Sequence, residues 1–342
     1  MTEGGEKTGS SVLSTSEPLE GRVGKPPHQI NEAVVVAAIR EVFRNAGVDT
    51  ERDDDDTARL EHLMASHITT DVTVEGVDFD RALYPLRFAG LRSLAQNVSD
   101  LYASDAEPVG FLWALSVPPS WSLDDVVRFS RGAADLAGAL GMPLLGGDLS
   151  RTNGPFQCAI TALGRAPQLS TTRRGARVGQ GVWLTRALGG SAVGLRVLMR
   201  DSVGEDEGVF ARWRRSLSTS EQRAVACHVE PSPVHPLERL TDFAVAAIDI
   251  SDGLAIDAGR LAMSSKVAID LDNLAAAVDV RAGATTDDAL RGGEDWAILF
   301  AVPDGLDPVG CIRVGTVVEG PAGRVTVDGE VVTGGHDHFA AR

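Results

Sequence analysis

Strand-like and helix-like segments alternate along most of this chain, and that alternation limits the fold more than any other feature of the sequence. Short β-branched or apolar runs are typical of strands, and longer stretches with apolar residues every three or four positions are typical of helices. Strands are predicted at 68–75, 111–117, 143–147, 156–163, 246–250, 267–271 and 296–302, with a hairpin at 325–332 around Asp328-Gly329, and a second unit is expected to begin at 182–185. Helices are predicted at 33–43, where Asn31 is the candidate N-cap, and at 87–103, 123–140, 190–200, 219–228, 236–246 and 254–265. This alternation predicts an α/β (α+β) fold.

The alternation is interrupted by a Gly-, Arg- and Thr-rich stretch at 166–181 that is typical of a linker. A chain of 342 residues is long enough for two domains, each with its own core. We therefore predict an N-terminal domain over 29–167 and a C-terminal α/β domain over 168–342. Residues 1–28, rich in Gly, Ser, Thr, Glu and Pro, predict a disordered tail.

The chain is acidic, with 32 Lys and Arg residues against 48 Asp and Glu residues and a formal net charge of −16. Because a nucleic-acid binder normally presents a basic face, the composition argues against that class. Cys158, Cys227 and Cys311 are far apart and lack Cys-x-x-Cys spacing, which is typical of reduced thiols. No apolar run approaches the ~18 residues of a membrane span, and the first residues lack the apolar centre of a signal peptide. We therefore expect a cytoplasmic protein without nucleic-acid or membrane partners.

Aspartates gather where an apolar run gives way to a turn that contains Gly or Ser. The five motifs are Thr70-Asp71, Asn97-Val-Ser-Asp100, Gly146-Gly-Asp148, Asp249-Ile-Ser-Asp-Gly253 and Gly292-Gly-Glu-Asp295. A single such motif is well explained as a helix cap or a turn aspartate. Five are not, because burying unpaired carboxylates is expensive. The interpretation that explains all five is a group of oxygen ligands for Mg²⁺, whose charge lets an acidic protein bind ATP.

Other nucleotide-binding and catalytic motifs are absent from the sequence. There is no G-x-x-x-x-G-K-[ST] loop, no G-x-G-x-x-G between a strand and a helix, no H-R-D loop and no G-x-S-x-G elbow. Gly189-Gly190-Ser191, ahead of a predicted helix, is a candidate phosphate-binding turn with only two glycines. His336-Asp-His338 is spaced like a metal motif, but its place near the C-terminus favours a solvated tail. Taken alone, the run Asp53–Asp56 is typical of a solvated loop.

Taken in order, the acidic motifs resemble those of the thiamine-monophosphate kinase family, within the aminoimidazole-ribonucleotide-synthetase superfamily. The residues that carry the resemblance are Asp54-Asp55-Asp56, Thr69-Thr-Asp-Val-Thr-Val-Glu-Gly-Val-Asp-Phe79, Asn97-Val-Ser-Asp100, Gly146-Gly-Asp148, Thr171-Thr-Arg-Arg-Gly-Ala176, Asp249-Ile-Ser-Asp-Gly-Leu254 and Gly292-Gly-Glu-Asp-Trp296. The resemblance implies a divergent member with two domains, an N-terminal mixed sheet with helices and a C-terminal α/β domain. It also implies a homodimer whose N-terminal domains pair their sheets.

The resemblance further implies an activity, the Mg²⁺-dependent transfer of the ATP γ-phosphoryl group to thiamine monophosphate. Carried over by motif, the ligands of several Mg²⁺ ions are Asp55, Asp56, Thr69, Thr70, Asp71, Asp100, Asp148, Asp249 and Asp252. The implied ATP contacts are Gly147, Asp148, Arg173 and Ser251, and Glu294 is the implied substrate contact. No general base is expected, since a phosphate oxygen is already a competent nucleophile.

The chain departs from the family pattern at positions expected near the substrate and the nucleotide. Asp78 replaces a histidine, His336 stands where an aromatic residue is usual, and Ser130 aligns with a tyrosine. We count Asp78 and His336 among the substrate-binding candidates and Ser130 among the ATP-binding candidates. Three functions stay open: a thiamine-monophosphate kinase, a paralogue that phosphorylates or ATP-activates another small molecule, and a non-catalytic nucleotide-binding relative.

Overall fold

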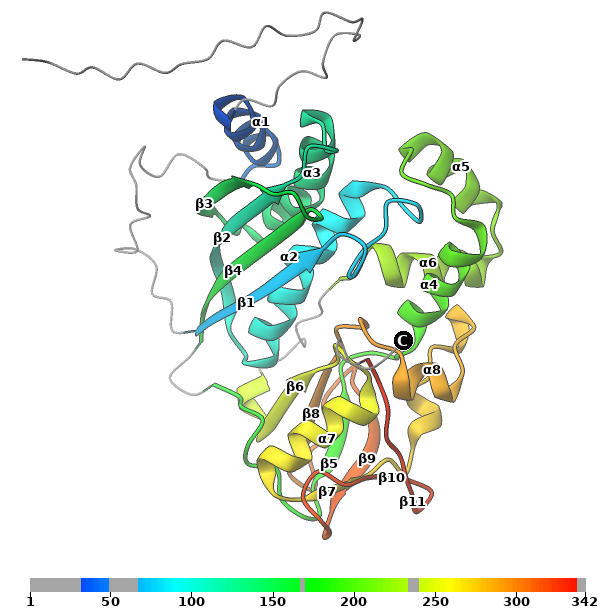
Figure 1. The fold of residues 1–342 in the computed structure, drawn as a ribbon. Coiled ribbons are helices and arrows are strands. Elements are labelled where there is room, and N and C mark those ends of the chain that lie inside the picture. The colour runs from blue at the N-terminus through cyan, green and yellow to red at the C-terminus, as the bar shows by residue number, and fades with distance from the viewer. Residues whose placement is uncertain (1–31, 49–66, 167–169, 233–239, 337–342) are drawn as a thin grey trace, which may run out of the picture.

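The computed structural model describes residues 32–48, 67–166, 170–232 and 240–336 (Figure 1). The predicted tail over 1–28, the candidate cap Asn31, the acidic run with Asp55 and Asp56, and His338 lie outside these residues. The described chain contains two β-sheets, one made of strands that end by Arg165 and one of strands that begin at Gly181, each packed with helices. The predicted α+β fold is confirmed, whereas the domain boundary at 167/168 stays a prediction.

The first sheet has four strands in the order β1-β4-β2-β3. They are β1 (His67–Val74), β2 (Glu107–Val117), β3 (Leu144–Arg151) and β4 (Gln157–Arg165). The sheet is mixed, as predicted, because β4 is antiparallel to both neighbours while β2 and β3 run parallel. Three helices accompany it: α1 (Glu32–Asn45), α2 (Leu86–Ala103) and α3 (Leu123–Leu140). α2 and α3 pack on one face of the sheet, and α1 packs on α3.

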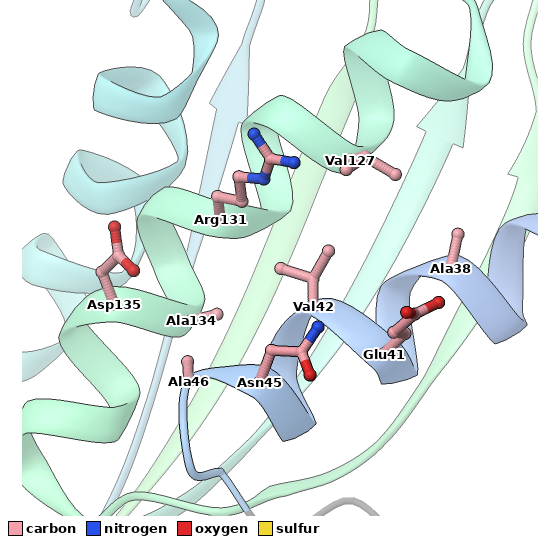
Figure 2. Close-up of a pocket in the computed structure, with 9 residues that line it drawn as sticks. All are labelled: Ala38, Glu41, Val42, Asn45, Ala46, Val127, Arg131, Ala134 and Asp135. Carbon is pink, nitrogen blue, oxygen red and sulfur yellow. The ribbon is translucent and has the colours of Figure 1, made fainter.

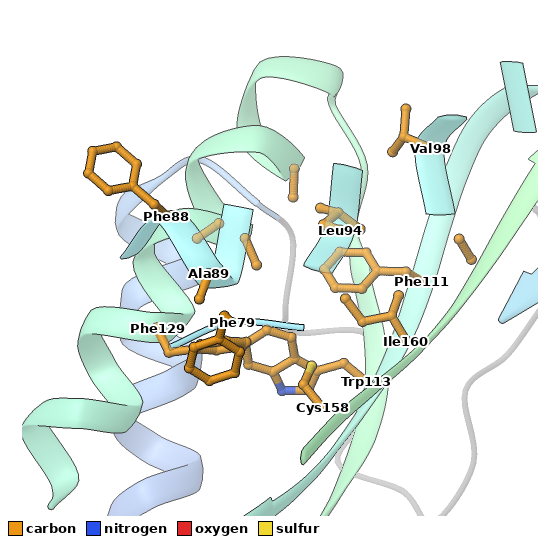
Figure 3. Close-up of a cluster of buried hydrophobic side chains, with 14 of the residues drawn as sticks. Phe79, Phe88, Ala89, Leu94, Val98, Phe111, Trp113, Phe129, Cys158 and Ile160 are labelled. Atoms are coloured by element: carbon orange, nitrogen blue, oxygen red, sulfur yellow. The ribbon is translucent and has the colours of Figure 1, made fainter. Parts of the chain in front are cut away.

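The core of this unit lies between the sheet and the helices α2 and α3 (Figure 3). It is rich in aromatic rings: Phe129 meets Phe156 edge to face with centroids 4.8 Å apart, and Trp121 stacks on Phe156. The two helices approach so closely that a Cβ at Gly132 would lie 1.6 Å from the carbonyl oxygen of Arg87. Such dense packing resists displacement. It therefore fixes the position of α2, which carries several residues of the site described below.

The second sheet has seven strands in the order β11-β10-β7-β9-β5-β8-β6. They are β5 (Gly181–Leu184), β6 (Ala246–Asp249), β7 (Ala268–Asp270), β8 (Ile298–Val302), β9 (Ile312–Val318), β10 (Val325–Val327) and β11 (Glu330–Val331). The helices of this half are α4 (Gly190–Asp201), α5 (Glu207–Ser216), α6 (Thr219–Val229), α7 (Leu254–Ser265) and α8 (Thr286–Arg291). α7 packs on the sheet, while α4, α5 and α6 lie beside the first unit (Figure 1). The predicted hairpin is confirmed, with positive φ angles of 51° at Asp328 and 82° at Gly329 in its turn.

One predicted helix is wrong, and several elements were not predicted. Within the described part of 236–246, residues 240–242 form a single 3₁₀ turn and β6 already begins at Ala246. A tertiary contact decides this, because the carboxylate of Asp105 accepts hydrogen bonds from the backbone N–H groups of Leu240 and Thr241. α5, α8 and β9 have no counterpart in the prediction. Among the described residues, no helix is long and apolar enough to cross a bilayer.

The two units meet along α2. The core of the first unit continues into the second, where Val197, Phe210, Val225 and Phe300 join it. Polar contacts cross the same boundary: Ser99 Oγ donates to Asp249 Oδ2 at 3.0 Å, and Thr171 Oγ1 donates to the carbonyl oxygen of Ala103 at 2.7 Å. α2 therefore places its own side chains against loops of the second sheet.

Candidate active site

The first part of the candidate site lies on the face of β1 that meets α2. Because side chains alternate along a strand, Thr69 and Asp71 point to that face and Thr70 to the other. Thr69 Oγ1 donates to Asp100 Oδ2 of α2 at 2.5 Å. Thr70 Oγ1 instead donates to the carbonyl oxygen of Ile160 in β4, so its side chain does not join Thr69 and Asp71.

Asp249 brings a third carboxylate to this place from the second sheet. It is the last residue of β6 and is held by the hydroxyl of Ser99, the neighbour of Asp100 in α2. The charge of Asp100 acts on both Asp71 and Asp249. We call Asp71, Asp100 and Asp249 the acidic group.

The negative charge of the acidic group is only partly compensated by the chain. Burial, together with Asp100 and Asp78, raises the pKa of Asp71 to about 6, and burial together with Asp100 and Asp257 raises that of Asp249 to about 8. Burial also raises the pKa of Asp100, against the hydrogen bond from Thr69 and the charge of Arg173. Asp71 Oδ2 is buried and has no hydrogen-bond partner among the described residues. Desolvated carboxylates that repel one another, one with an unpartnered oxygen, are the environment that a bound cation stabilises.

The oxygen donors suit Mg²⁺, which takes one or two protein carboxylates and completes its shell with water and substrate phosphate. In the described part of the chain, no three His, Cys, Asp or Glu side chains come close enough together to hold an ion by themselves.

The turn after Asp249 is organised by a residue that the sequence did not single out. The buried Asp257 Oδ2 accepts hydrogen bonds from the backbone N–H groups of Ser251, Asp252 and Gly253 at 3.0–3.2 Å. Arg260 then pairs with both Asp252 and Asp257, at 2.6 and 2.7 Å. The turn is therefore rigid, and the carboxylate of Asp252, a predicted metal ligand, is engaged with a guanidinium.

The second part of the site is an ion pair between a buried arginine of α2 and a partly exposed glutamate of the loop 292–296. The Arg92 side chain is 5% exposed and donates to Glu294 Oε1 at 2.6 Å. It also donates to the carbonyl oxygen of His228 at 2.5 Å, and its guanidinium lies over the Trp296 ring at 5.2 Å from the centroid. Burial and the Arg92 charge lower the pKa of His228 to about 3, so this imidazole is neutral. We call Arg92, Glu294 and His228 the ion-pair group.

The loop that carries Glu294 is held in a strained conformation. Glu294 has a φ of 62° and Trp296 a φ of 42°, which non-glycine residues seldom adopt. Asp295, between them, accepts hydrogen bonds from the backbone N–H groups of Gly189 and Ser191 at 2.7 and 3.2 Å. The structure therefore gives the candidate phosphate-binding turn at Gly189-Gly190-Ser191 no support, because Asp295 occupies the N–H groups of Gly189 and Ser191.

The three predicted substrate-binding residues lie around the ion-pair group. Glu294 belongs to it, and His336 lies within electrostatic reach of Glu294 while its backbone N–H donates to the carbonyl oxygen of Asp252. Asp78 Oδ2 accepts from the N–H of Val74 at 2.7 Å, and its charge acts on Arg92. The two parts of the site adjoin, because the N–H of Glu294 donates to the carbonyl oxygen of Ser251, two residues after Asp249.

The predicted ATP-binding residues are only partly brought together. Arg173 is exposed in the linker, where its charge acts on Asp100 and Asp249. Gly147 and Asp148 lie on β3, at the opposite edge of the sheet from β1 and about 14 Å away at ~4.8 Å per strand. Ser130 is fully buried in α3 and donates to the carbonyl oxygen of Val126, so the geometry gives its predicted ATP contact no support.

A separate cavity of about 420 Å³ opens between α1 and α3 (Figure 2). Apolar side chains such as Val42 and Val127 line it together with Glu41, Arg131 and Asp135. None of the lining residues is a predicted site residue, so this cavity is distinct from the acidic and ion-pair groups.

Comparisons with known proteins agree with the fold and the motifs. The model of the AIR synthase related protein N-terminal domain matches residues 52–166. The thiamine-monophosphate kinase of Escherichia coli (strain K12) is 32% identical over 300 residues, which cover 80% of this chain and 86% of that protein. The crystal structure of thiamine-monophosphate kinase from Stenotrophomonas maltophilia K279a matches with a TM-score of 0.72 at 27% identity, over 86% of this chain and 97% of that chain. A solved structure described as AaThiL complexed with AMPPCP and TMP matches with a TM-score of 0.68 at 27% identity, over 90% of this chain and 97% of that chain.

Proposed function

This chain belongs to the thiamine-monophosphate kinase family, and from that premise we propose that it transfers the γ-phosphoryl group of ATP to the phosphate of thiamine monophosphate, giving thiamine diphosphate. The observation that carries the proposal is the junction of the acidic group with the ion-pair group where α2 meets the second sheet. The first suits metal-bound phosphates, and the second suits the organic part of a substrate. Phosphoryl transfer needs both next to each other.

In this proposal Asp71, Asp100 and Asp249 hold Mg²⁺, and Asp55, Asp56, Asp148, Asp252 and the hydroxyls of Thr69 and Thr70 stay predicted ligands. When bound, Mg²⁺ neutralises charge on the phosphates of ATP and of the acceptor. Thr69 and Ser99 orient the carboxylates of Asp100 and Asp249 by donating to one oxygen of each, which leaves the other oxygen available.

The remaining residues position the reactants. In this proposal Arg173 contacts phosphate oxygens bidentately, and the effect of its charge on Asp100 and Asp249 supports that role. Ser251 lies in the turn that Asp257 holds, two residues after Asp249. Glu294 faces the substrate while Arg92 fixes its orientation. No side chain needs to remove a proton, because the attacking group is a phosphate oxygen.

A homodimer would complete the nucleotide site. Ile68, Val72 and Leu112 are 69%, 53% and 38% exposed on the outer face of the first sheet. The strand register puts Asp148 in one row with Val72 on that face, turned away from Asp71. We propose that a second copy covers this apolar face and brings its Gly147 and Asp148 to ATP. The location in the cytoplasm stays a prediction.

The dimer is tested by its mass in solution. Sedimentation is expected to give twice the chain mass of 36.0 kDa for the natural sequence and the mass of one chain for the double variant Ile68→Lys/Val72→Lys. Two buried lysines on the interface would oppose association. A natural protein that sediments as one chain at micromolar concentration contradicts the dimer.

The activity is tested by incubating the purified protein with thiamine monophosphate, ATP and Mg²⁺ and measuring thiamine diphosphate. We expect product with Mg²⁺ and loss of turnover with excess EDTA, since the acidic group has no other source of positive charge sufficient for two phosphates. Binding of the ATP analogue AMPPCP without any product would favour a paralogue with another acceptor. Absence of both product and AMPPCP binding would contradict the kinase altogether.

A further inference from the structure

Tyr84 carries a buried hydroxyl that nothing in the described chain satisfies. The residue precedes α2 and is 2% exposed. Its Oη has no hydrogen-bond partner among the described residues. An unpaired buried hydroxyl is destabilising, so nearly all such groups in proteins are paired. A group left unpaired in the free protein is a candidate for pairing with a ligand.

The hydroxyl lies among the residues of the proposed substrate site. The Tyr84 ring meets that of His228 edge to face, with centroids 5.8 Å apart at 74°. The charges of Arg92, Glu294 and Asp78 all act on its hydroxyl, and burial raises its pKa to about 12, so it stays a donor. Glu294 and Arg92 already satisfy each other at 2.6 Å, and Asp78 accepts from the N–H of Val74. Among the described residues around Glu294, the donor without a hydrogen-bond partner is therefore the Tyr84 hydroxyl.

We propose that the Tyr84 hydroxyl donates a hydrogen bond to a pyrimidine nitrogen of bound thiamine monophosphate and so helps to select that substrate. This rests on the proposed function. Thiamine monophosphate has two kinds of strong acceptor, the phosphate oxygens and the pyrimidine nitrogens, because the thiazolium nitrogen has no free lone pair. The phosphate must lie at the acidic group for transfer. The pyrimidine nitrogens are then the acceptors left for a donor beside Glu294.

A hydroxyl that gains a partner only when the substrate binds lets the protein discriminate strongly between that substrate and its analogues. A site built to donate to a substrate acceptor rejects analogues that lack it, since the buried donor is then left without a partner. Glu294, two residues from Trp296 on the same loop, offers a carboxylate for the amino group of the same ring. Donor and acceptor together match the edge of an aminopyrimidine.

The variant Tyr84→Phe tests this, with Tyr102→Phe as the matched control, because the chain contains only these two tyrosines. We expect Tyr84→Phe to raise the KM for thiamine monophosphate about tenfold and to leave the KM for ATP unchanged. The melting temperature of the free variant should stay the same or rise, since an unpaired buried hydroxyl is removed. Tyr102→Phe should change neither KM. An unchanged KM for thiamine monophosphate with a raised melting temperature would mean that the hydroxyl is merely unsatisfied, and would overturn the proposal.

A second measurement identifies the acceptor. Two analogues of thiamine monophosphate, each with one pyrimidine nitrogen replaced by C–H, are compared on the natural protein and on Tyr84→Phe. The KM difference between the two proteins should vanish for one analogue and persist for the other. A difference that persists for both rejects the pyrimidine nitrogen. If the natural protein shows no turnover of thiamine monophosphate, the proposed function fails with this inference, whereas normal turnover with equal KM values in both proteins rejects the inference alone.

Discussion

Replacing Asp71 by asparagine is expected to lower kcat/KM for phosphoryl transfer by at least ~10²-fold and to raise the stability of the free protein. The loss of activity follows from removing a metal-binding carboxylate, because charge neutralisation on the phosphates is the main source of catalysis here. The gain in stability follows from burial and the repulsion by Asp100 and Asp78, which raise the pKa of Asp71 to about 6. An asparagine carries no charge at that place.

Turnover and the melting temperature without Mg²⁺ and nucleotide measure the two effects. The control is Asp135→Asn, whose 51% exposed carboxylate in α3 pairs with Arg87 at 3.3 Å, away from the acidic group. It should leave both quantities nearly unchanged. Full activity in Asp71→Asn would show that Asp71 binds no catalytic metal, and a fall in melting temperature would show that its charge is compensated in the free protein.

Replacing Arg92 by leucine is expected to reduce the free energy of unfolding by about 1–3 kcal/mol, because the carbonyl oxygen of the buried His228 and the 37% exposed carboxylate of Glu294 then lose their common donor. The double variant Arg92→Leu/Glu294→Gln should recover part of that loss, since no unpaired charge remains. Arg87→Leu, in the same helix, is the control. Its ion pair is 39% and 51% exposed and is expected to contribute at most about 1 kcal/mol.

Denaturant titration of the four proteins measures these differences. Equal losses in the free energy of unfolding for Arg92→Leu and Arg87→Leu would mean that Arg92 contributes no more to stability than a surface residue. A double variant less stable than Arg92→Leu would mean that Glu294 has another partner of comparable strength.

The acidic group was predictable because its residues sit in local patterns. Asp249 ends an apolar strand ahead of a Ser-Asp-Gly turn, and that pattern is visible in six residues. Strand alternation, applied to β1, separates Thr69 and Asp71 from Thr70. The motif alone predicted all three as metal ligands, because spacing along the sequence does not show the direction in which each side chain points.

Most of the ion-pair group could not be predicted from the sequence, because the residues that contact one another are far apart along the chain. Arg92 meets His228 and Glu294 at separations of 136 and 202 residues, and nothing local distinguishes it from the exposed Arg87 one and a half turns earlier. The same reason explains the wrong helix over 236–246, where Asp105 binds Leu240 from a distant turn. No sequence pattern marks Tyr84 either, since only the packing of the folded chain shows that its hydroxyl has no partner among the described residues.

The position of the metal tests the central claim most directly. Crystals of the protein grown with AMPPCP, thiamine monophosphate and Mn²⁺ in place of Mg²⁺ give anomalous scattering at each bound ion. A site as described here predicts Mn²⁺ within coordination distance of carboxylate oxygens of Asp71, Asp100 or Asp249, between the phosphates of the two ligands, with the pyrimidine ring beside Glu294. Ions and phosphates bound elsewhere, with these three carboxylates free of metal, would contradict it.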